Sequence, residues 1–102
     1  MAVSPTRLRE VVPDRVAAQV RALGDQYGIR NIRIFGSFAR GEARSDSDLD
    51  LLVEYVPGRN GFAFVEFCAR AEELLGRRID VVTENSLHPL VRDTILGQAV
   101  PL

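Results

Sequence analysis

Two carboxylates two positions apart, Asp48 and Asp50, follow a Gly-Ser pair by about ten residues and suggest a site for a metal-bound phosphate. Side chains alternate across a β-strand, so a strand beginning at Asp48 places both carboxylates on one face, about 7 Å apart along the chain. Neighbouring carboxylates repel each other and raise each other's pKa. Mg²⁺ removes this problem, because it prefers oxygen ligands and keeps positions open for water and phosphate.

A third carboxylate, Asp80, interrupts a second short apolar run at Arg78–Val82. An acid between Ile79 and Val81 is either a charge at a strand edge or a further metal ligand or base. The pair at 48 and 50 favours the second interpretation, because one more carboxylate completes a site for a hard cation.

The Gly36-Ser37 pair ends the apolar run Ile32–Phe35 and is suited to holding phosphate. Glycine lets the backbone turn sharply and approach a ligand closely, and serine caps helices and offers a hydroxyl. We expect Phe38–Arg40 to form a first helical turn whose free amides bind anions, and Gly41 to end it. Arg40 is a further candidate for phosphate binding, because its guanidinium is a planar cationic donor.

On these residues the chain resembles the minimal nucleotidyltransferases, small members of the DNA polymerase β-type nucleotidyltransferase superfamily. The family's Gly-Ser and Asp-x-Asp signature matches Gly36, Ser37, Asp48 and Asp50, and its third aspartate falls on Asp80. The resemblance covers roughly residues 15–97, which is nearly the whole chain. It implies a nucleotidyltransferase fold of the α/β (α+β) class, with a short mixed β-sheet packed by helices.

The resemblance also implies a reaction. Asp48, Asp50 and Asp80 would hold one or two Mg²⁺ ions, with Asp80 helping to deprotonate an acceptor hydroxyl. Gly36, Ser37 and Arg40 would bind the triphosphate of ATP. Attack at the α-phosphorus transfers AMP and releases pyrophosphate, and paired ions stabilise both the attacking and the leaving oxygens.

The expected acceptor lies on another chain. Larger relatives carry an extra domain for the acceptor, whereas only about five residues follow the last helix expected here. In the family the partner is commonly a HEPN-domain toxin, and the minimal nucleotidyltransferase acts as its antitoxin by adenylylating a tyrosine. Two alternatives stay open: an antitoxin that neutralises its toxin by binding alone, and a catalytic subunit for a small-molecule acceptor. A nucleotide other than ATP also stays open.

Length and composition indicate one domain over residues 1–102, with residues 1–12 as an N-terminal extension or short helix. A hydrophobic fraction of 46% is enough for a core, and the net charge of −1 gives no basis for a nucleic-acid surface. The single cysteine excludes an internal disulfide and suits a reducing cytoplasm. The sequence shows no signal peptide and no run near the ~20 apolar residues of a membrane span.

Helical and strand patterns alternate along the chain, which predicts an α/β sandwich. A Ser4-Pro5 cap is expected to begin a short first helix. The further expected helices are Pro13–Tyr27, Phe62–Leu75 and Ser86–Leu96, the expected strands are Ile29–Phe35, Asp48–Tyr55 and Arg78–Thr83, and Pro57–Gly61 is a loop.

Helical spacing also predicts which side chains form the core. One apolar stripe is Val16, Val20 and Leu23, and the other is Phe64, Phe67, Cys68, Ala71, Leu74 and Leu75, with Phe62 joining the phenylalanine cluster. Cys68 is therefore expected to be an ordinary core residue, and part of the phenylalanine cluster is a candidate partner surface. His88, which precedes Pro89, is expected to be a loop or capping residue, and Asp46 and Glu54 are expected to be surface charges.

Overall fold

A computed structural model of the chain describes residues 5–44, 46–56, 58 and 61–102. Its elements follow in the order α1 (Pro5–Val11), α2 (Asp14–Tyr27), β1 (Ile29–Phe35), β2 (Leu49–Tyr55), α3 (Ala63–Leu75), β3 (Ile79–Thr83), a 3₁₀ turn η1 (Glu84–Ser86), α4 (Pro89–Gln98) and β4 (Val100–Pro101). The expected Ser4 cap and part of the Pro57–Gly61 loop lie outside the described residues.

The four strands form one mixed sheet in the order β3-β2-β1-β4. β1 pairs antiparallel with both β2 and β4, and β2 pairs in parallel with β3. α3 makes the crossover that a parallel pair requires. The mixed α+β class predicted from the sequence is therefore confirmed, with β4 as an additional edge strand that the apolar pattern did not predict.

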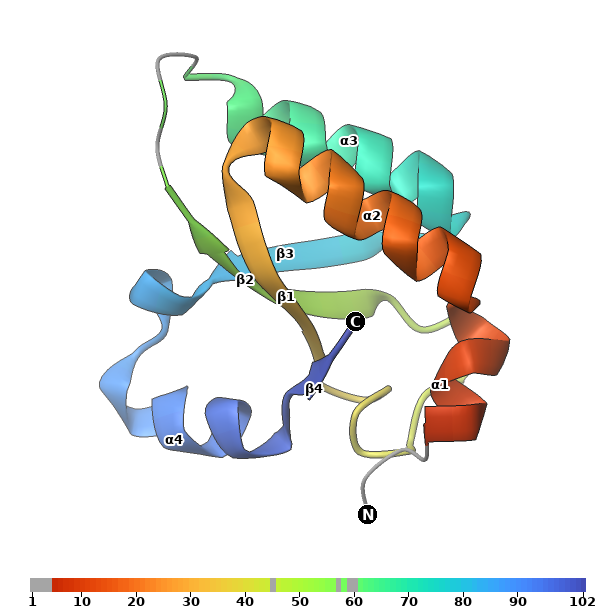
Figure 1. Ribbon diagram of the computed structural model, residues 1–102. Coiled ribbons are helices and arrows are strands. Elements are labelled where there is room, and N and C mark those ends of the chain that lie inside the picture. Colours follow the sequence, from red (N-terminus) through yellow and green to blue (C-terminus); the bar gives the residue numbers. More distant parts are fainter. Residues whose placement is uncertain (1–4, 45, 57, 59–60) are drawn as a thin grey trace.

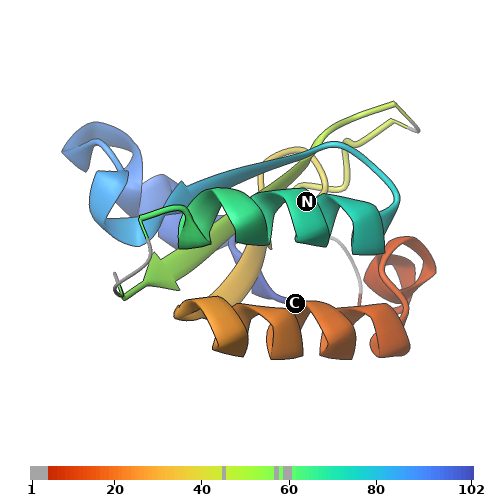
Figure 2. The ribbon, with the colours of Figure 1, turned by 90° about the horizontal axis from the view of Figure 1, so that it is seen from above.

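α2 and α3 lie side by side across one face of the sheet, and α4 lies on the other side of the strands (Figure 1). The view from above shows α2 and α3 as one layer (Figure 2). β2 alternates between the two faces, so Leu49, Leu51 and Val53 enter the core under this layer. Asp50 and Leu52 consequently face away from α2 and α3.

Glycines end the two long helices where the sequence predicted. Gly28 follows α2 and Gly76 follows α3, both in the left-handed conformation, with φ of 73° and 66°. Each donates its backbone N–H to the carbonyl of the residue four positions earlier, which closes the final turn. The ends of α2 and α3, and so the starts of β1 and β3, are fixed by local chain chemistry.

The predicted apolar stripes are confirmed except at Leu74, and Phe62 does not join the core as predicted. Val20, Leu23, Phe67 and Ala71 are buried, and Cys68 is half-buried against the core. Phe62 is 76% exposed and Leu74 is 37% exposed. Phe62 occupies the N-cap position just before α3 and is not part of the buried face of the helix.

The last predicted helix begins later than expected. Ser86 belongs to η1, and α4 starts at Pro89 with His88 as its N-cap. The His88 ring Nδ1 accepts a hydrogen bond of 3.1 Å from the Leu90 backbone N–H, so the capping role predicted for His88 is confirmed. No described helix is both long enough and apolar enough to cross a bilayer.

Candidate active site

Asp50 and Asp80 occupy paired positions on neighbouring strands. The parallel register of β2 and β3 places Asp50 opposite Asp80, and neighbouring strands lie about 4.8 Å apart. Their carboxylates therefore leave the same face of the sheet from adjacent points. Burial raises the pKa of Asp50, and the negative charges of Asp80 and Asp48 raise it further. The acids that the sequence predicted to act together are thus close enough to repel.

Asp48 lies immediately before β2, one residue outside the strand that the sequence predicted to include it. The Leu49 backbone N–H donates to the Arg78 carbonyl at 3.0 Å, which holds this end of β2 against the start of β3. The Asp48 Oδ1 atom lies 3.9 Å from Arg78 Nε in an exposed ion pair. Asp48 is consequently at the same edge as the other two acids but turned toward an arginine.

These donors suit Mg²⁺ in type, because all three are carboxylates. They suit it in charge, because burial and then the neighbouring carboxylates raise the pKa of Asp50, and a cation offsets both. Within the described ranges no three acidic, histidine or cysteine side chains are already arranged around one metal position. A carboxylate pair with a third acid beside it therefore fits the ion if the Asp48 side chain leaves Arg78.

Gly36 lies directly against the Asp50 carboxylate. Its φ is 75°, in the left-handed region that side chains other than hydrogen disfavour. A Cβ at this position would collide with Asp50 Oδ2 and lie 3.1 Å from its Cγ. The glycine predicted from the sequence is thus required both by the backbone and by the acid that it contacts.

The residues after Gly36 form a single closed turn, as the sequence predicted, and this turn does not extend into a longer helix. The Arg40 N–H donates to the Gly36 carbonyl at 3.0 Å, and the Glu42 N–H donates to the Ser37 carbonyl at 2.8 Å. Gly41 follows with φ of 75°, which ends the turn after one cycle. Ser37 is half-buried at the start of this turn, which we call the phosphate turn (Gly36–Gly41).

Arg40 extends from the phosphate turn and remains largely exposed. Its Nε lies 3.1 Å from Glu42 Oε2, and its Nη1 donates to Gln98 Oε1 at 3.4 Å. The positive charge of Arg40 opposes the rise in the Asp50 pKa. The structure therefore places this predicted phosphate ligand within electrostatic reach of the acids.

Arg77 was not predicted from the sequence as part of this region. Its guanidinium carbon lies 4.9 Å from the ring centroid of Phe38, which is a buried residue of the phosphate turn. Its Nη1 atom is buried and has no hydrogen-bond partner. The only signal in the sequence is the Arg77-Arg78 doublet, which does not indicate a contact with residue 38.

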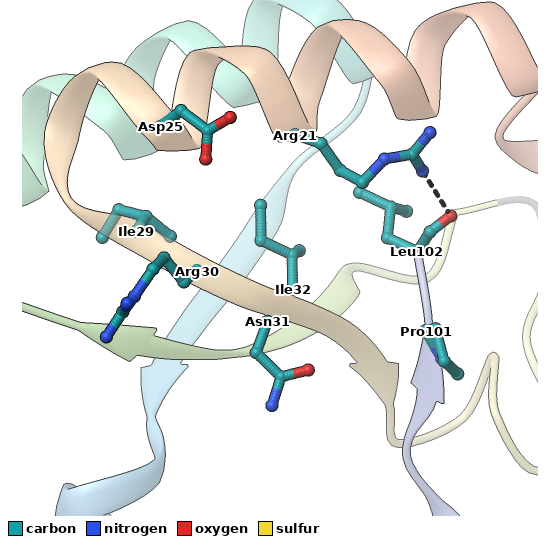
Figure 3. A pocket seen from close by; sticks show the side chains of 8 residues that line it. All are labelled: Arg21, Asp25, Ile29, Arg30, Asn31, Ile32, Pro101 and Leu102. Carbon is teal, nitrogen blue, oxygen red and sulfur yellow. Dashed lines mark hydrogen bonds between the residues drawn. The ribbon is translucent and has the colours of Figure 1, made fainter.

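A separate hollow of about 580 Å³ lies between α2, β1 and the end of the described chain (Figure 3). It contains none of the predicted site residues, and the Arg21 guanidinium at its rim donates to the Leu102 carbonyl oxygen at 3.1 Å. Its lining residues are Arg21, Asp25, Ile29, Arg30, Asn31, Ile32, Pro101 and Leu102. The hollow therefore plays no part in the arrangement of the acids.

The mixed sheet pairs Asp50 and Asp80 on parallel strands beside Gly36, which is the arrangement that the resemblance to nucleotidyltransferases predicts. Comparison with known families agrees, since the model of the nucleotidyltransferase domain family matches residues 16–102. The chain belongs to this family and is a nucleotidyltransferase.

One named relative and two solved structures are similar to this chain. The chain is 36% identical over 91 residues to protein adenylyltransferase MntA of Thermococcus cleftensis, covering 89% of this chain and 92% of that protein. A solved structure provisionally described as a minimal nucleotidyltransferase is 40% identical, with a TM-score of 0.74, and the match covers 100% of this chain and 97% of that one. A complex of tri-AMPylated Shewanella oneidensis HEPN toxin with MNT antitoxin contains a chain of the same fold, with 18% identity, a TM-score of 0.59 and coverage of 85% and 68%.

Proposed function

We propose that this chain transfers AMP from Mg²⁺–ATP to a tyrosine hydroxyl of a HEPN-domain toxin and thereby acts as its antitoxin. The observation that carries the proposal is the pairing of Asp50 with Asp80 beside Gly36 in a member of the nucleotidyltransferase family. A relative named protein adenylyltransferase supports the type of group transferred. The complex of a HEPN toxin with an MNT antitoxin supports the type of partner.

The proposed site has a distinct task for each part. Asp48, Asp50 and Asp80 hold Mg²⁺, which when bound neutralises phosphate charge and stabilises the displacement. Gly36 allows the triphosphate to approach the backbone closely, and the Arg40 guanidinium donates to phosphate oxygens. Positioning and electrostatic stabilisation then supply most of the rate increase.

The reaction balances without a further reactant. The acceptor oxygen forms a bond to the α-phosphorus of ATP, and the bond from that phosphorus to the bridging oxygen of the β-phosphate breaks. Pyrophosphate leaves with that oxygen. Asp80, which is more exposed than Asp50, is the base that takes the proton of the hydroxyl.

Co-expression of the chain with its cognate toxin tests this function. Wild type is expected to restore growth and to add AMP, detected by mass spectrometry, to a tyrosine of the toxin. Asp80→Asn is expected to keep the fold and much of the nucleotide binding while reducing transfer by at least ~100-fold, because general-base contributions are typically of that order. Glu54→Gln, an exposed change on β2, is the matched control.

Two results would contradict the proposal in different ways. If Asp48→Asn/Asp50→Asn restores growth as well as wild type and no AMP is found on the toxin, the chain neutralises by binding. If wild type transfers AMP only to a small molecule, the acceptor class is wrong although the nucleotidyltransferase chemistry remains.

A further inference from the structure

The side chain of Gln98 joins the end of α4 to the phosphate turn. Its Oε1 atom accepts a hydrogen bond of 2.9 Å from the Gly36 backbone N–H and a second of 3.4 Å from Arg40 Nη1. Its Nε2 atom donates to the Thr94 carbonyl at 3.4 Å, one turn earlier in α4. One carbonyl oxygen therefore contacts both the glycine and the arginine of the proposed triphosphate site.

The register of β4 explains how a residue so distant in sequence reaches the turn. β4 pairs antiparallel with β1, and Val100 lies opposite Ile34. Continuing this register by two residues brings Gln98 opposite Gly36, after the ladder itself has ended. Gly36 is buried, so its N–H needs an acceptor. The Gln98 side chain supplies the acceptor that a strand backbone would otherwise provide.

Arg40 gains a defined position from the same contact. Its side chain is 45% exposed, and its other polar contact among the described residues is the ion pair with Glu42, two residues away and just after the turn. A guanidinium has five N–H donors, so its bonds to Glu42 and Gln98 leave donors available for a ligand. Because α4 has no buried residue, Gln98 is also a principal link between this helix and the site.

We propose that Gln98 is a positioning residue of the nucleotide site, which fixes the backbone of Gly36 and holds the Arg40 guanidinium beside it for the triphosphate. The inference rests on the proposed function, since it assigns Gln98 to the nucleotide that this function requires. It adds the C-terminal end of α4 to a site otherwise built from β1, β2, β3 and the phosphate turn.

Calorimetry with Mg²⁺–ATP on the full chain tests this role. Gln98→Met keeps the length of the side chain but removes the acceptor, and it is expected to weaken binding about three- to tenfold, as for the loss of about one net hydrogen bond. Gln19→Met, an exposed glutamine on α2, is the matched control and is expected to bind as wild type does. Thermal melts of each variant check that the fold is retained.

Two further measurements separate positioning from a purely structural role. Hydrogen exchange at the Gly36 amide is expected to accelerate about tenfold or more in Gln98→Met while core amides keep their protection. The loss of ATP affinity in Gln98→Met/Arg40→Met is expected to be smaller than the product of the two single losses, because Gln98 acts partly through Arg40.

The outcomes that overturn the inference are distinct from failure of the proposed function. Unchanged ATP affinity in Gln98→Met, with or without faster Gly36 exchange, rejects a role in the site. Tighter binding shows that Gln98 competes with phosphate, and strictly multiplicative losses reject the link through Arg40. If wild type itself binds no Mg²⁺–ATP, the proposed function fails first, whatever the variants do.

Discussion

Replacing Asp50 by asparagine is expected to stabilise the metal-free protein. Asp50 is half-buried, and burial together with the negative charges of Asp80 and Asp48 raises its pKa. A raised pKa in the folded state means that the ionised carboxylate costs stability at neutral pH. Asparagine has nearly the same shape and no charge, so it removes this cost without opening a cavity beside Gly36.

The size of the effect follows from the register. Asp50 and Asp80 lie on neighbouring strands, and two unit charges about 5 Å apart repel by about 0.8 kcal/mol in a water-like dielectric. That dielectric is suitable because Asp80 is exposed. One kcal/mol shifts the Tm of a domain of this size by about 4–8 °C. Loss of this repulsion in Asp50→Asn is therefore expected to raise the Tm by about 3–6 °C, in addition to any gain from burying a neutral side chain.

Thermal unfolding in chelator and in Mg²⁺ is the assay. In chelator the variant melts above wild type, whereas Mg²⁺ raises the Tm of wild type and has little effect on the variant, because ligand binding stabilises only the form that binds. The advantage of asparagine disappears as the pH falls from the raised pKa of folded Asp50 toward its ordinary value of 3.8, since the wild-type carboxyl becomes neutral in both states.

Glu54→Gln, which neutralises an exposed acid on the same strand, serves as the control and is expected to change stability by less than about 0.5 kcal/mol. A lower Tm for Asp50→Asn than for wild type in chelator would refute the reasoning, because it would mean that the carboxylate stabilises the fold. An equal response of both proteins to Mg²⁺ would refute the assignment of Asp50 as a ligand.

Two further predictions concern the phosphate turn. Gly36→Ala is expected to lower the free energy of unfolding, measured with denaturant, by at least ~2 kcal/mol and to abolish ATP binding. The reason is that the new Cβ strains a φ of 75° and collides with the Asp50 carboxylate. A stable variant that binds ATP normally would contradict this. Arg77→Met is expected to leave the free energy of unfolding unchanged or to raise it by up to about 1 kcal/mol in the same assay. Methionine keeps an apolar contact with Phe38 and removes a buried Nη1 atom that has no hydrogen-bond partner among the described residues. A decrease of more than ~2 kcal/mol would show that the cation–π contact dominates.

The elements that carry their own boundary signals could be predicted from the sequence. Gly28 and Gly76 end α2 and α3 where expected, and the strand Ile29–Phe35 has the predicted bounds. Alternation alone placed Asp50 on the face away from Leu49 and Leu51. These predictions succeed because each depends on residues within a few positions of the one predicted.

The features that the sequence did not predict correctly are those that tertiary contacts determine. Phe62 has helical spacing with the core stripe, but the helix starts one residue later and leaves the ring exposed. The turn that Gly41 ends was predicted, but the contact of the Arg77 guanidinium with the Phe38 ring in that turn was not. Residue types near Phe62 and Phe38 permit other placements, and the packing of the surrounding elements selects the ones observed.

The sequence predicts some contacts of the site and not others. It predicts that Asp50 and Asp80 act together, but it does not predict the contact of Gln98 with Gly36. Asp80 was identified because an acid within an apolar strand is chemically conspicuous, and its partner then followed from the parallel register. Gln98 is an ordinary polar residue at the end of a helix, and its role appears only once the two-residue strand β4 fixes its position opposite Gly36. The acids proposed as ligands are thus visible in this sequence, whereas Gln98, proposed to position Gly36 and Arg40, depends on a strand pairing too short to leave a pattern.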